Sequence, residues 1–266
     1  MPMIRARGVP ALLMLLSACS SGRAEPGGGG GAGTSGAAGD GSGGVSGDGG
    51  GGTSGAGGGA GAGGAGAPAA ERWLIDSTTS IHGLTPMVLG APVVTSTPQG
   101  DALCFDGDDA VVLEAHPLAG LGAFTLEVLI RIDGVTAAAL NQPRYLHIEA
   151  TTGPARATME ARVTDTNFYL DTFLLAGTAS RTLADSAKAH PVGQWTWTAL
   201  TYDGATMRHY VDGVEDASGE VTVPAFGPGK MSLGVRQNLM YWFAGCIREV
   251  RVTPVPLPPA ELQRAL

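Results

Sequence analysis

Positively charged residues are scarce in this sequence of 266 residues. Lys and Arg number 16 against 24 Asp and Glu, and the formal net charge is −8. Residues 1–70 are neutral overall, so this charge lies entirely on residues 71–266. Binding to nucleic-acid phosphates or anionic lipid headgroups depends on clustered Lys and Arg. The composition therefore argues against nucleic acid as a partner, and against direct contact of the acidic part with anionic lipid.

Familiar catalytic and metal-binding motifs are absent from the sequence. It contains no His-Glu-x-x-His, no Cys-x-x-Cys and no Gly-x-Ser-x-Gly after a predicted strand. The five histidines also lack the spacing of metal ligands. The sequence therefore indicates no catalytic residue, and we expect a protein that is not an enzyme.

Long apolar runs are missing as well, and the N-terminus carries only a short one. Arg5 and Arg7 precede the apolar run Val9–Leu16, which is far shorter than the roughly 20 residues of a membrane-spanning helix. A basic start followed by a short apolar run is typical of an export signal. We therefore expect residues 1–18 to be a signal peptide.

The end of this run, Leu16-Ser17-Ala18-Cys19, resembles the lipobox of bacterial lipoproteins. The resemblance implies cleavage before Cys19 and lipidation of that cysteine, which would anchor the chain to a membrane. An ordinary secretory signal with a chance cysteine is the alternative. Ser20 stands where an aspartate would favour retention in the inner membrane, so we expect the outer membrane or cell surface, with the periplasmic face left open.

Glycine is concentrated in one segment. Residues 22–66 hold 25 of the 43 glycines, without the three-residue period of collagen. Such a Gly/Ser/Ala tract buries too little apolar surface to offset its backbone entropy. We expect residues 19–70 to be a disordered tether with a root-mean-square reach of roughly 35–40 Å. A low-complexity insertion without a selected length is the alternative.

Alternating apolar residues dominate the chain after residue 71. In the segment Phe124–Ile132 the apolar side chains share one face, and Glu127 and Arg131 lie on the other. Turn residues separate many such segments. Residues 71–266 therefore predict one all-β domain, a two-sheet antiparallel sandwich, with a short helix over residues 258–266. The other predicted strands are Ala102–Phe105, Ala110–Glu114, Tyr145–Ala150, Ala157–Val163, Phe168–Leu174, Trp195–Tyr202, Met207–Val211, Val221–Val223, Met231–Leu233 and Cys246–Val252.

An ordered set of these segments resembles laminin G-like domains of the concanavalin A-like superfamily. The set consists of Leu103–Val111 (LCFDGDDAV), Phe124–Ile132, Gly193–Gly213 (GQWTWTALTYDGATMRHYVDG) and Phe243–Val252 (FAGCIREVRV). The resemblance implies a jelly-roll fold over residues 71–266. It also implies that the first and last strands of the domain are neighbours. Cys104 and Cys246 remain once Cys19 is lipidated, so we expect these two to form a disulfide in an oxidising compartment; two buried free thiols are the alternative.

Acidic and basic residues recur on the predicted solvent faces of the strands. The paired catalytic carboxylates that laminarinase-like relatives carry as Glu-x-Asp-x-Glu on one strand are absent. Ion-pair ladders are the expected role of these charged residues, and a ligand groove or a catalytic pair are the alternatives. The residues concerned are Glu127, Glu149 and Glu160, beside Arg131, His147 and Arg162.

A possible calcium site is indicated by Asp106, Asp108 and Asp109, which cluster in one turn. Calcium prefers hard oxygen ligands of this kind, and many members of the superfamily bind it. Arg248 stands where relatives often have an aspartate, so it could pair with Asp106 instead. Solvated turn aspartates are therefore the favoured interpretation, and calcium is the alternative.

Carbohydrate is the first class of ligand that the sequence indicates. The segment before the last strand combines aromatic and amide side chains in Gln237, Asn238, Tyr241 and Trp242, although Trp242 could simply pack under the sandwich edge. Asn167 and Tyr169 form a second candidate, and Glu149 and Glu160 could line a groove.

These expectations define one main functional hypothesis. We expect a membrane-anchored, non-catalytic lectin-like module that binds a glycan. An adhesion module that binds an envelope or surface protein is the alternative. A glycoside hydrolase or lyase with unrecognised carboxylates is a more distant one, because one fold hosts many activities.

Overall fold

The computed structural model describes residues 68–135 and 141–265. The signal peptide, Cys19 and nearly all of the predicted tether lie outside these residues. Among the described residues, no helix has the length and apolar character needed to span a membrane.

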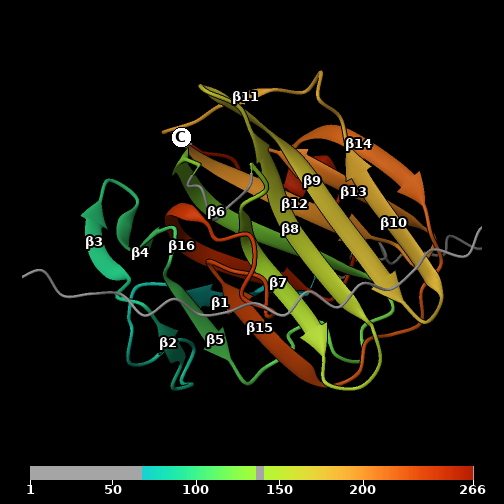
Figure 1. Cartoon of the computed structure of the whole chain (residues 1–266). Coiled ribbons are helices and arrows are strands. Elements are labelled where there is room, and N and C mark those ends of the chain that lie inside the picture. Colours follow the sequence, from blue (N-terminus) through green and yellow to red (C-terminus); the bar gives the residue numbers. More distant parts are fainter. Residues whose placement is uncertain (1–67, 136–140, 266) are drawn as a thin grey trace, which may run out of the picture. The chain divides into compact units, whose positions relative to one another are not determined.

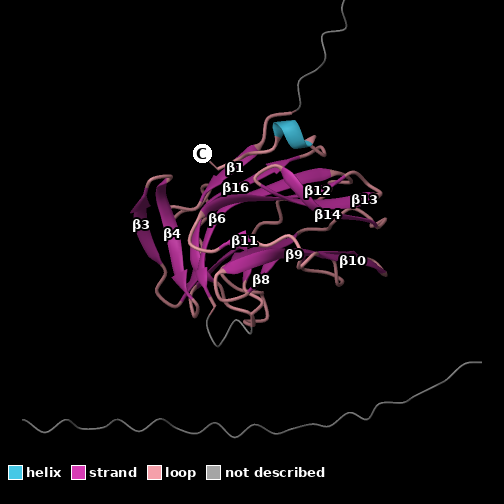
Figure 2. Cartoon of the chain, turned by 90° about the horizontal axis from the view of Figure 1, so that it is seen from above, coloured by secondary structure: helices cyan, strands magenta, loops and turns pink. Residues whose placement is uncertain are grey.

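The described chain forms two antiparallel sheets of eight strands each, which Figure 2 shows as separate layers. The first sheet has the order β14 (Val214–Glu220), β13 (Thr206–Val211), β12 (Trp195–Tyr202), β6 (Phe124–Gly134), β16 (Ala244–Thr253), β4 (Gly100–Asp106) and β3 (Val93–Thr97), and β1 (Glu71–Leu74) also pairs with β16. The second has the order β10 (Ala179–Ala184), β9 (Asn167–Ala176), β8 (Arg156–Val163), β7 (Arg144–Ala150), β15 (Gly229–Leu233), β5 (Ala110–Leu113) and β2 (Met87–Leu89), and β11 (His190–Pro191) also pairs with β9. This arrangement confirms the predicted all-β jelly-roll sandwich (Figure 1).

The space between the sheets is filled by the alternating apolar side chains. Leu126, Val128 and Ile130 of β6 are fully buried, as are Leu146 of β7 and Met159 of β8. Since successive side chains of a strand point to opposite faces, the residues between them face outward. The core thereby fixes which polar residues of each strand reach the outer surface.

Two polar contacts also lie within the interior. The Tyr145 hydroxyl donates to Thr198 Oγ1 at 3.2 Å, and Thr172 Oγ1 lies 3.0 Å from His209 Nδ1. Each contact links one sheet to the other, because Tyr145 and Thr172 belong to the second sheet and their partners to the first. These links pair buried polar groups that would otherwise be costly to bury.

The predicted strand Val221–Val223 is wrong, because the strand in this region is β14, Val214–Glu220. Val221 and Val223 are nevertheless buried in the core. The backbone N–H of Val223 donates to the Tyr202 hydroxyl at 2.9 Å instead of joining a ladder.

The predicted C-terminal helix is also wrong. The described part of this segment contains only a single 3-10 turn, Pro259–Glu261, followed by an extended Leu262. Leu262 packs against Ala199 and Tyr210 on the outer face of the first sheet. Carboxylates of that face accept the backbone N–H groups of the segment, as Glu127 does from Gln263 at 2.7 Å. These contacts hold the segment extended along the sheet rather than coiled.

The predicted disulfide is confirmed. Cys104 of β4 and Cys246 of β16 are direct cross-strand partners, and their sulfur atoms are bonded. The bond lies on the outer side of the first sheet, where the Arg131 guanidinium also donates to Cys246 Sγ at 3.3 Å.

Candidate functional site

A pocket opens on the outer face of the second sheet, on strands β7, β8, β9 and β10. Its volume is about 190 Å³. The pocket exists because Ala157, Met159 and Ala161 of β8 fill the core, so that the alternate residues of this strand point outward. The lining residues are Arg144, Arg156, Thr158, Glu160, Arg162, Asp171, Phe173, Thr182 and Arg236.

Two buried carboxylates form the floor of the pocket. Glu160 of β8 and Asp171 of β9 are direct cross-strand partners, and their side chains are only 5% and 3% exposed. Each pairs with an arginine: Glu160 with Arg144, and Asp171 Oδ2 with Arg162 Nε at 2.5 Å. The other oxygen of Asp171 and Nη1 of Arg144 are buried without a hydrogen-bond partner in the structure, so the floor retains capacity for a bound molecule.

Burial shifts the pKa of Glu160 and of its partner Arg144. It raises the pKa of Glu160 to about 7; the adjacent Asp171 adds to the rise, while Arg144 and Arg162 oppose it. Burial also lowers the pKa of the Arg144 guanidinium, against the pull of Glu160. Perturbed groups of this kind cluster at functional sites, although structural ion pairs also produce them.

Two further arginines border the pocket without an acidic partner. The guanidinium of Arg156 lies over the Phe173 ring, 4.8 Å from its centroid. Arg236 comes from the loop between β15 and β16. Within residues 68–135 and 141–265, neither side chain pairs with a carboxylate.

The predicted glycan-binding residues Gln237, Asn238, Tyr241 and Trp242 lie in a loop beside this pocket, but none of them lines it. Tyr241 places its ring 3.9 Å from the Arg144 guanidinium, and Gln237 ties the loop to the sheet by donating to the Lys230 carbonyl at 2.9 Å. Asn238 is exposed and Trp242 is half-buried, and neither lines the pocket. The loop residue that does line it, Arg236, is one that the sequence analysis missed.

The three predicted glutamates do not share a face. Glu127 belongs to the first sheet, where the C-terminal segment covers it, so its inclusion with the others was wrong. Glu160 lies in the pocket, whereas Glu149, farther along the second sheet, lies outside it. The expected ion pair forms for Glu160, and its partner is Arg144.

The other predicted polar residues lie apart from the pocket. Arg131 pairs with Asp133 at 2.6 Å. His147 Nε2 lies 3.8 Å from Glu149, but burial lowers the pKa of this histidine to about 3, so it is neutral near pH 7 and forms no ion pair. Asn167 and Tyr169 lie on β9, and neither belongs to the pocket lining.

The predicted aspartate cluster is present. Oxygens of Asp106, Asp108 and Asp109 lie within 4.8 Å of one another. Both oxygens of Asp109 are already engaged, however, because one accepts the Ala91 N–H at 2.5 Å and the other the Asp106 N–H at 3.2 Å. Calcium takes six to eight oxygen ligands, so this donor set fits it poorly. Calcium binding therefore stays a prediction from the sequence alone.

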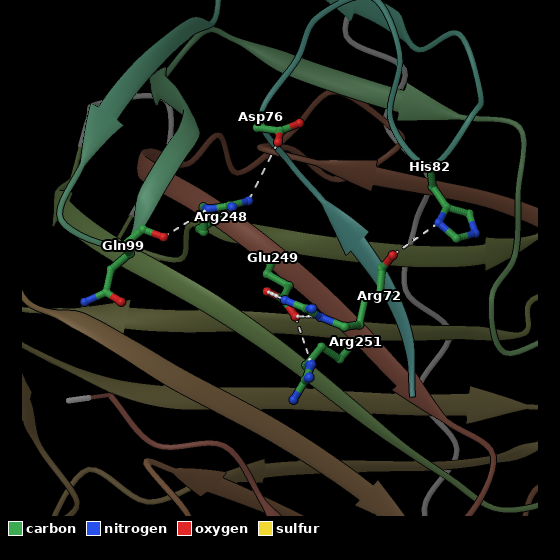
Figure 3. Close-up of polar contacts among 7 residues, drawn as sticks. All are labelled: Arg72, Asp76, His82, Gln99, Arg248, Glu249 and Arg251. Atoms are coloured by element: carbon green, nitrogen blue, oxygen red, sulfur yellow. Dashed lines mark hydrogen bonds and ion pairs between the residues drawn. The ribbon is translucent and has the colours of Figure 1, made fainter. Parts of the chain in front are cut away.

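A second hollow, of about 380 Å³, lies on the outer face of the first sheet. Figure 3 shows Arg72 and Arg251 converging there on Glu249, at 2.7 and 2.8 Å. Burial raises the pKa of Glu249, but the two arginines outweigh this effect and leave the pKa below its ordinary value. The carboxylate is therefore ionised and is shared by two arginines, as expected for a structural ion-pair network.

Arg248 in the same hollow corrects one expectation. It donates to the Gln99 carbonyl at 3.2 Å and lies 3.9 Å from Asp76, as Figure 3 shows, rather than pairing with Asp106. The reason is its place on β16 between β1 and β4, which brings the segments after β1 and before β4 within its reach.

Sequence comparison agrees with this geometry. Residues 105–263, more than half of the chain, match the laminin G-like family described as "Concanavalin A-like lectin/glucanases superfamily". The chain belongs to this superfamily. The pocket of this concanavalin A-like domain lies entirely within the matched residues. No curated protein sequence matches the chain significantly.

Solved structures share the fold of this concanavalin A-like domain. The binding domain of botulinum neurotoxin serotype G has a TM-score of 0.52 at 7% identity, over 71% of this chain and 48% of that one. The binding domain of botulinum neurotoxin DC, solved in complex with SialylT, has a TM-score of 0.50 at 12% identity, over 72% and 49%. Domain 4 of the arabinanase AbnA from Geobacillus stearothermophilus, in complex with arabinotriose, has a TM-score of 0.48 at 18% identity, over 71% and 94%. The chain thus spans about half the length of the neurotoxin domains, and the likeness to those domains establishes the fold alone.

Proposed function

We propose that this protein is a non-catalytic carbohydrate-binding module, held at the outer membrane or cell surface by a lipid on Cys19. The observation that carries the proposal is the pocket on the second sheet. It combines buried, partly unpartnered polar atoms with the aromatic side chain of Phe173.

The composition of the pocket suits a sugar. Phe173 and Tyr241 offer aromatic surface near Arg156 and Arg144, and aromatic surface packs against the C–H groups of a sugar ring. Thr158 and Thr182 add hydroxyl groups to the lining, which can donate to or accept from sugar hydroxyls. Ligand sites commonly combine apolar surface with a few placed polar groups in this way.

A binding role is favoured over hydrolysis by the state of the two carboxylates. A retaining glycosidase needs an accessible acid and nucleophile about 5–5.5 Å apart. Here Glu160 and Asp171 are almost fully buried, and each is paired with its own arginine. We therefore expect no release of reducing sugar from any polysaccharide. Turnover that disappears in Glu160→Gln would support the glycosidase alternative instead.

Removal of the Phe173 ring is expected to weaken polysaccharide binding about fivefold, since an aromatic contact of this kind contributes of order 1 kcal/mol. Affinity electrophoresis and calorimetry with a panel of soluble polysaccharides would measure the effect in Phe173→Ala. Trp195→Ala is the matched control, because Trp195 is a half-buried aromatic on the other sheet.

Trp242→Ala separates the pocket from the loop tip that the sequence indicated. If Trp242→Ala abolishes binding and Phe173→Ala leaves it unchanged, the pocket is not the site. If no polysaccharide binds the wild-type protein, the proposed function fails, and an adhesion role toward protein becomes the better hypothesis.

The membrane anchor makes a separate prediction. In a Gram-negative bacterial host, the wild-type chain is expected to fractionate with membranes and to incorporate labelled fatty acid, because lipidation of Cys19 supplies the apolar attachment. Cys19→Ser is expected to lose the label and most of the membrane association. Ser35→Ala, which leaves both the lipobox and the disulfide intact, is the control. An unlabelled wild-type chain in the soluble fraction would contradict the lipoprotein assignment.

A further inference from the structure

We propose that the ligand of the second-sheet pocket is an acidic polysaccharide, with a carboxylate or sulfate group bound between Arg156 and Arg236. This inference rests on the proposed carbohydrate-binding function and adds the chemical class of the ligand. The pocket carries a charge opposite in sign to that of the whole chain.

The pocket is positive although the protein is acidic. Its lining contains four arginines and two carboxylates, whereas the full chain has a net charge of −8. Arg144 and Arg162 are used by Glu160 and Asp171. Two positive charges therefore remain in the lining without a carboxylate partner among the described residues.

The positive charge of Arg236 acts on Arg156. Burial lowers the pKa of Arg156, and the positive charge of Arg236 lowers it further, while Glu149 opposes both. Arg156 is half-buried against the Phe173 ring, which restricts its guanidinium to one side of the pocket. Two like charges held close together at a partly desolvated site repel each other. A bound anion would remove this repulsion.

Arginine is well suited to such an anion. Its planar guanidinium offers several N–H donors and can bind a carboxylate or sulfate group through two parallel hydrogen bonds. The aromatic ring of Phe173 beneath Arg156 would pack against the sugar that carries the acidic group. Neutral sugars lack any group that needs two unpaired cations.

A second cluster of arginines, around Glu249 on the first sheet, provides a comparison. Around Glu249, Arg72 and Arg251 share one carboxylate, and Arg248 bonds to the Gln99 carbonyl (Figure 3). That cluster has internal partners for each of these three side chains. The second-sheet pocket differs because Arg156 and Arg236 lack such partners.

Binding to polymers of known charge tests the inference. Polygalacturonate supplies carboxylates, dextran sulfate supplies sulfates, and dextran is neutral. We expect one or both acidic polymers to bind, dextran not to bind, and affinity to fall as salt is raised. Arg156→Gln and Arg236→Gln are each expected to weaken binding about ten- to hundredfold, because each removes charge-assisted hydrogen bonds.

Control variants separate the pocket from bulk charge. Lys188→Gln removes one positive charge from an exposed position outside the pocket, so its affinity should match the wild type. Arg156→Lys keeps the charge but not the planar donor pair, and it is expected to bind with intermediate affinity. Thermal melting of each variant checks that the fold is retained.

The outcomes distinguish the inference from the proposed function. Equal binding of dextran and the acidic polymers, unaffected by Arg156→Gln and Arg236→Gln, would overturn the acidic-ligand inference and leave carbohydrate binding intact. If Lys188→Gln weakens binding as much as the two arginine variants do, the acidic-ligand inference is also overturned. Binding would then reflect nonspecific electrostatic attraction rather than binding in the pocket. Absence of binding to every neutral and acidic polymer would overturn the proposed function itself. Selective loss in the two arginine variants would support the inference for whichever acidic group binds.

Discussion

Loss of the Cys104–Cys246 disulfide is expected to lower the free energy of unfolding of the domain by about 4–5 kcal/mol. The two cysteines are 142 residues apart in sequence, and cross-linking such a long loop removes much of the conformational freedom of the unfolded chain. Urea unfolding of Cys104→Ala/Cys246→Ala, followed by tryptophan fluorescence, would measure the change against the wild type.

Reduction of the wild-type protein provides the control for this prediction. Reduced wild type and the double variant should unfold at similar urea concentrations, because both lack the cross-link. Only the double variant has also lost the two sulfur atoms, so the comparison separates the effect of the cross-link from the effect of the substitutions. A double variant as stable as the oxidised wild type would contradict the prediction. Loss of the disulfide should weaken the pairing of β4 with β16 in particular. These strands pair through only four residues of β16, Ala244–Ile247, and the disulfide lies among them.

The inner strands of both sheets could be predicted from the sequence, whereas several edge strands could not. β6 and β12 have neighbours on both sides, and their alternating apolar residues fill the core. β14 and β10 lie at the sheet edges, and about half of their residues are polar and exposed. Val221 and Val223 show the opposite error, because buried apolar residues suggested a strand where the chain is only packed against the core.

The site was predictable only in part, for a related reason. Alternation along β8 places Glu160 and Arg162 on one face, so the sequence could identify them as outward-facing charges. The pairing of Glu160 with Asp171 depends on the register between β8 and β9, which alternation does not specify. Arg236 reaches the same pocket only because of the path of its loop. The aspartate cluster, in contrast, lies within one turn and was therefore visible from the sequence.

Two histidines, His147 and His209, are buried in their neutral form. They are expected to lower the free energy of unfolding of the domain as the pH falls below about 6.5. Burial lowers the pKa of His147 to about 3 and that of His209 to about 4, from an ordinary value of 6.5. Between these values the unfolded chain binds protons that the folded chain does not bind, so the free energy of unfolding decreases with falling pH. At pH 5 the two shifts together correspond to about 4 kcal/mol.

Glu160 acts in the opposite direction and must be removed to expose this effect. Its folded pKa of about 7 lies above the ordinary 4.5, so between pH 7 and pH 4.5 the folded chain binds a proton that the unfolded chain does not. Its contribution to stability therefore increases as the pH falls and partly cancels the loss caused by His147 and His209. Urea unfolding between pH 7 and pH 5 should show a steeper loss of stability in Glu160→Gln than in the wild type.

Replacing the histidines in that background identifies them as the source. His147→Gln/His209→Gln, made together with Glu160→Gln, should show a much flatter dependence on pH, because glutamine does not titrate and can keep a hydrogen bond to Thr172 at position 209. Burial lowers the pKa of His116 as well, so a smaller slope of the same sign should remain. An unchanged slope in the triple variant would contradict the prediction, because it would show that His147 and His209 are not the source of the pH dependence.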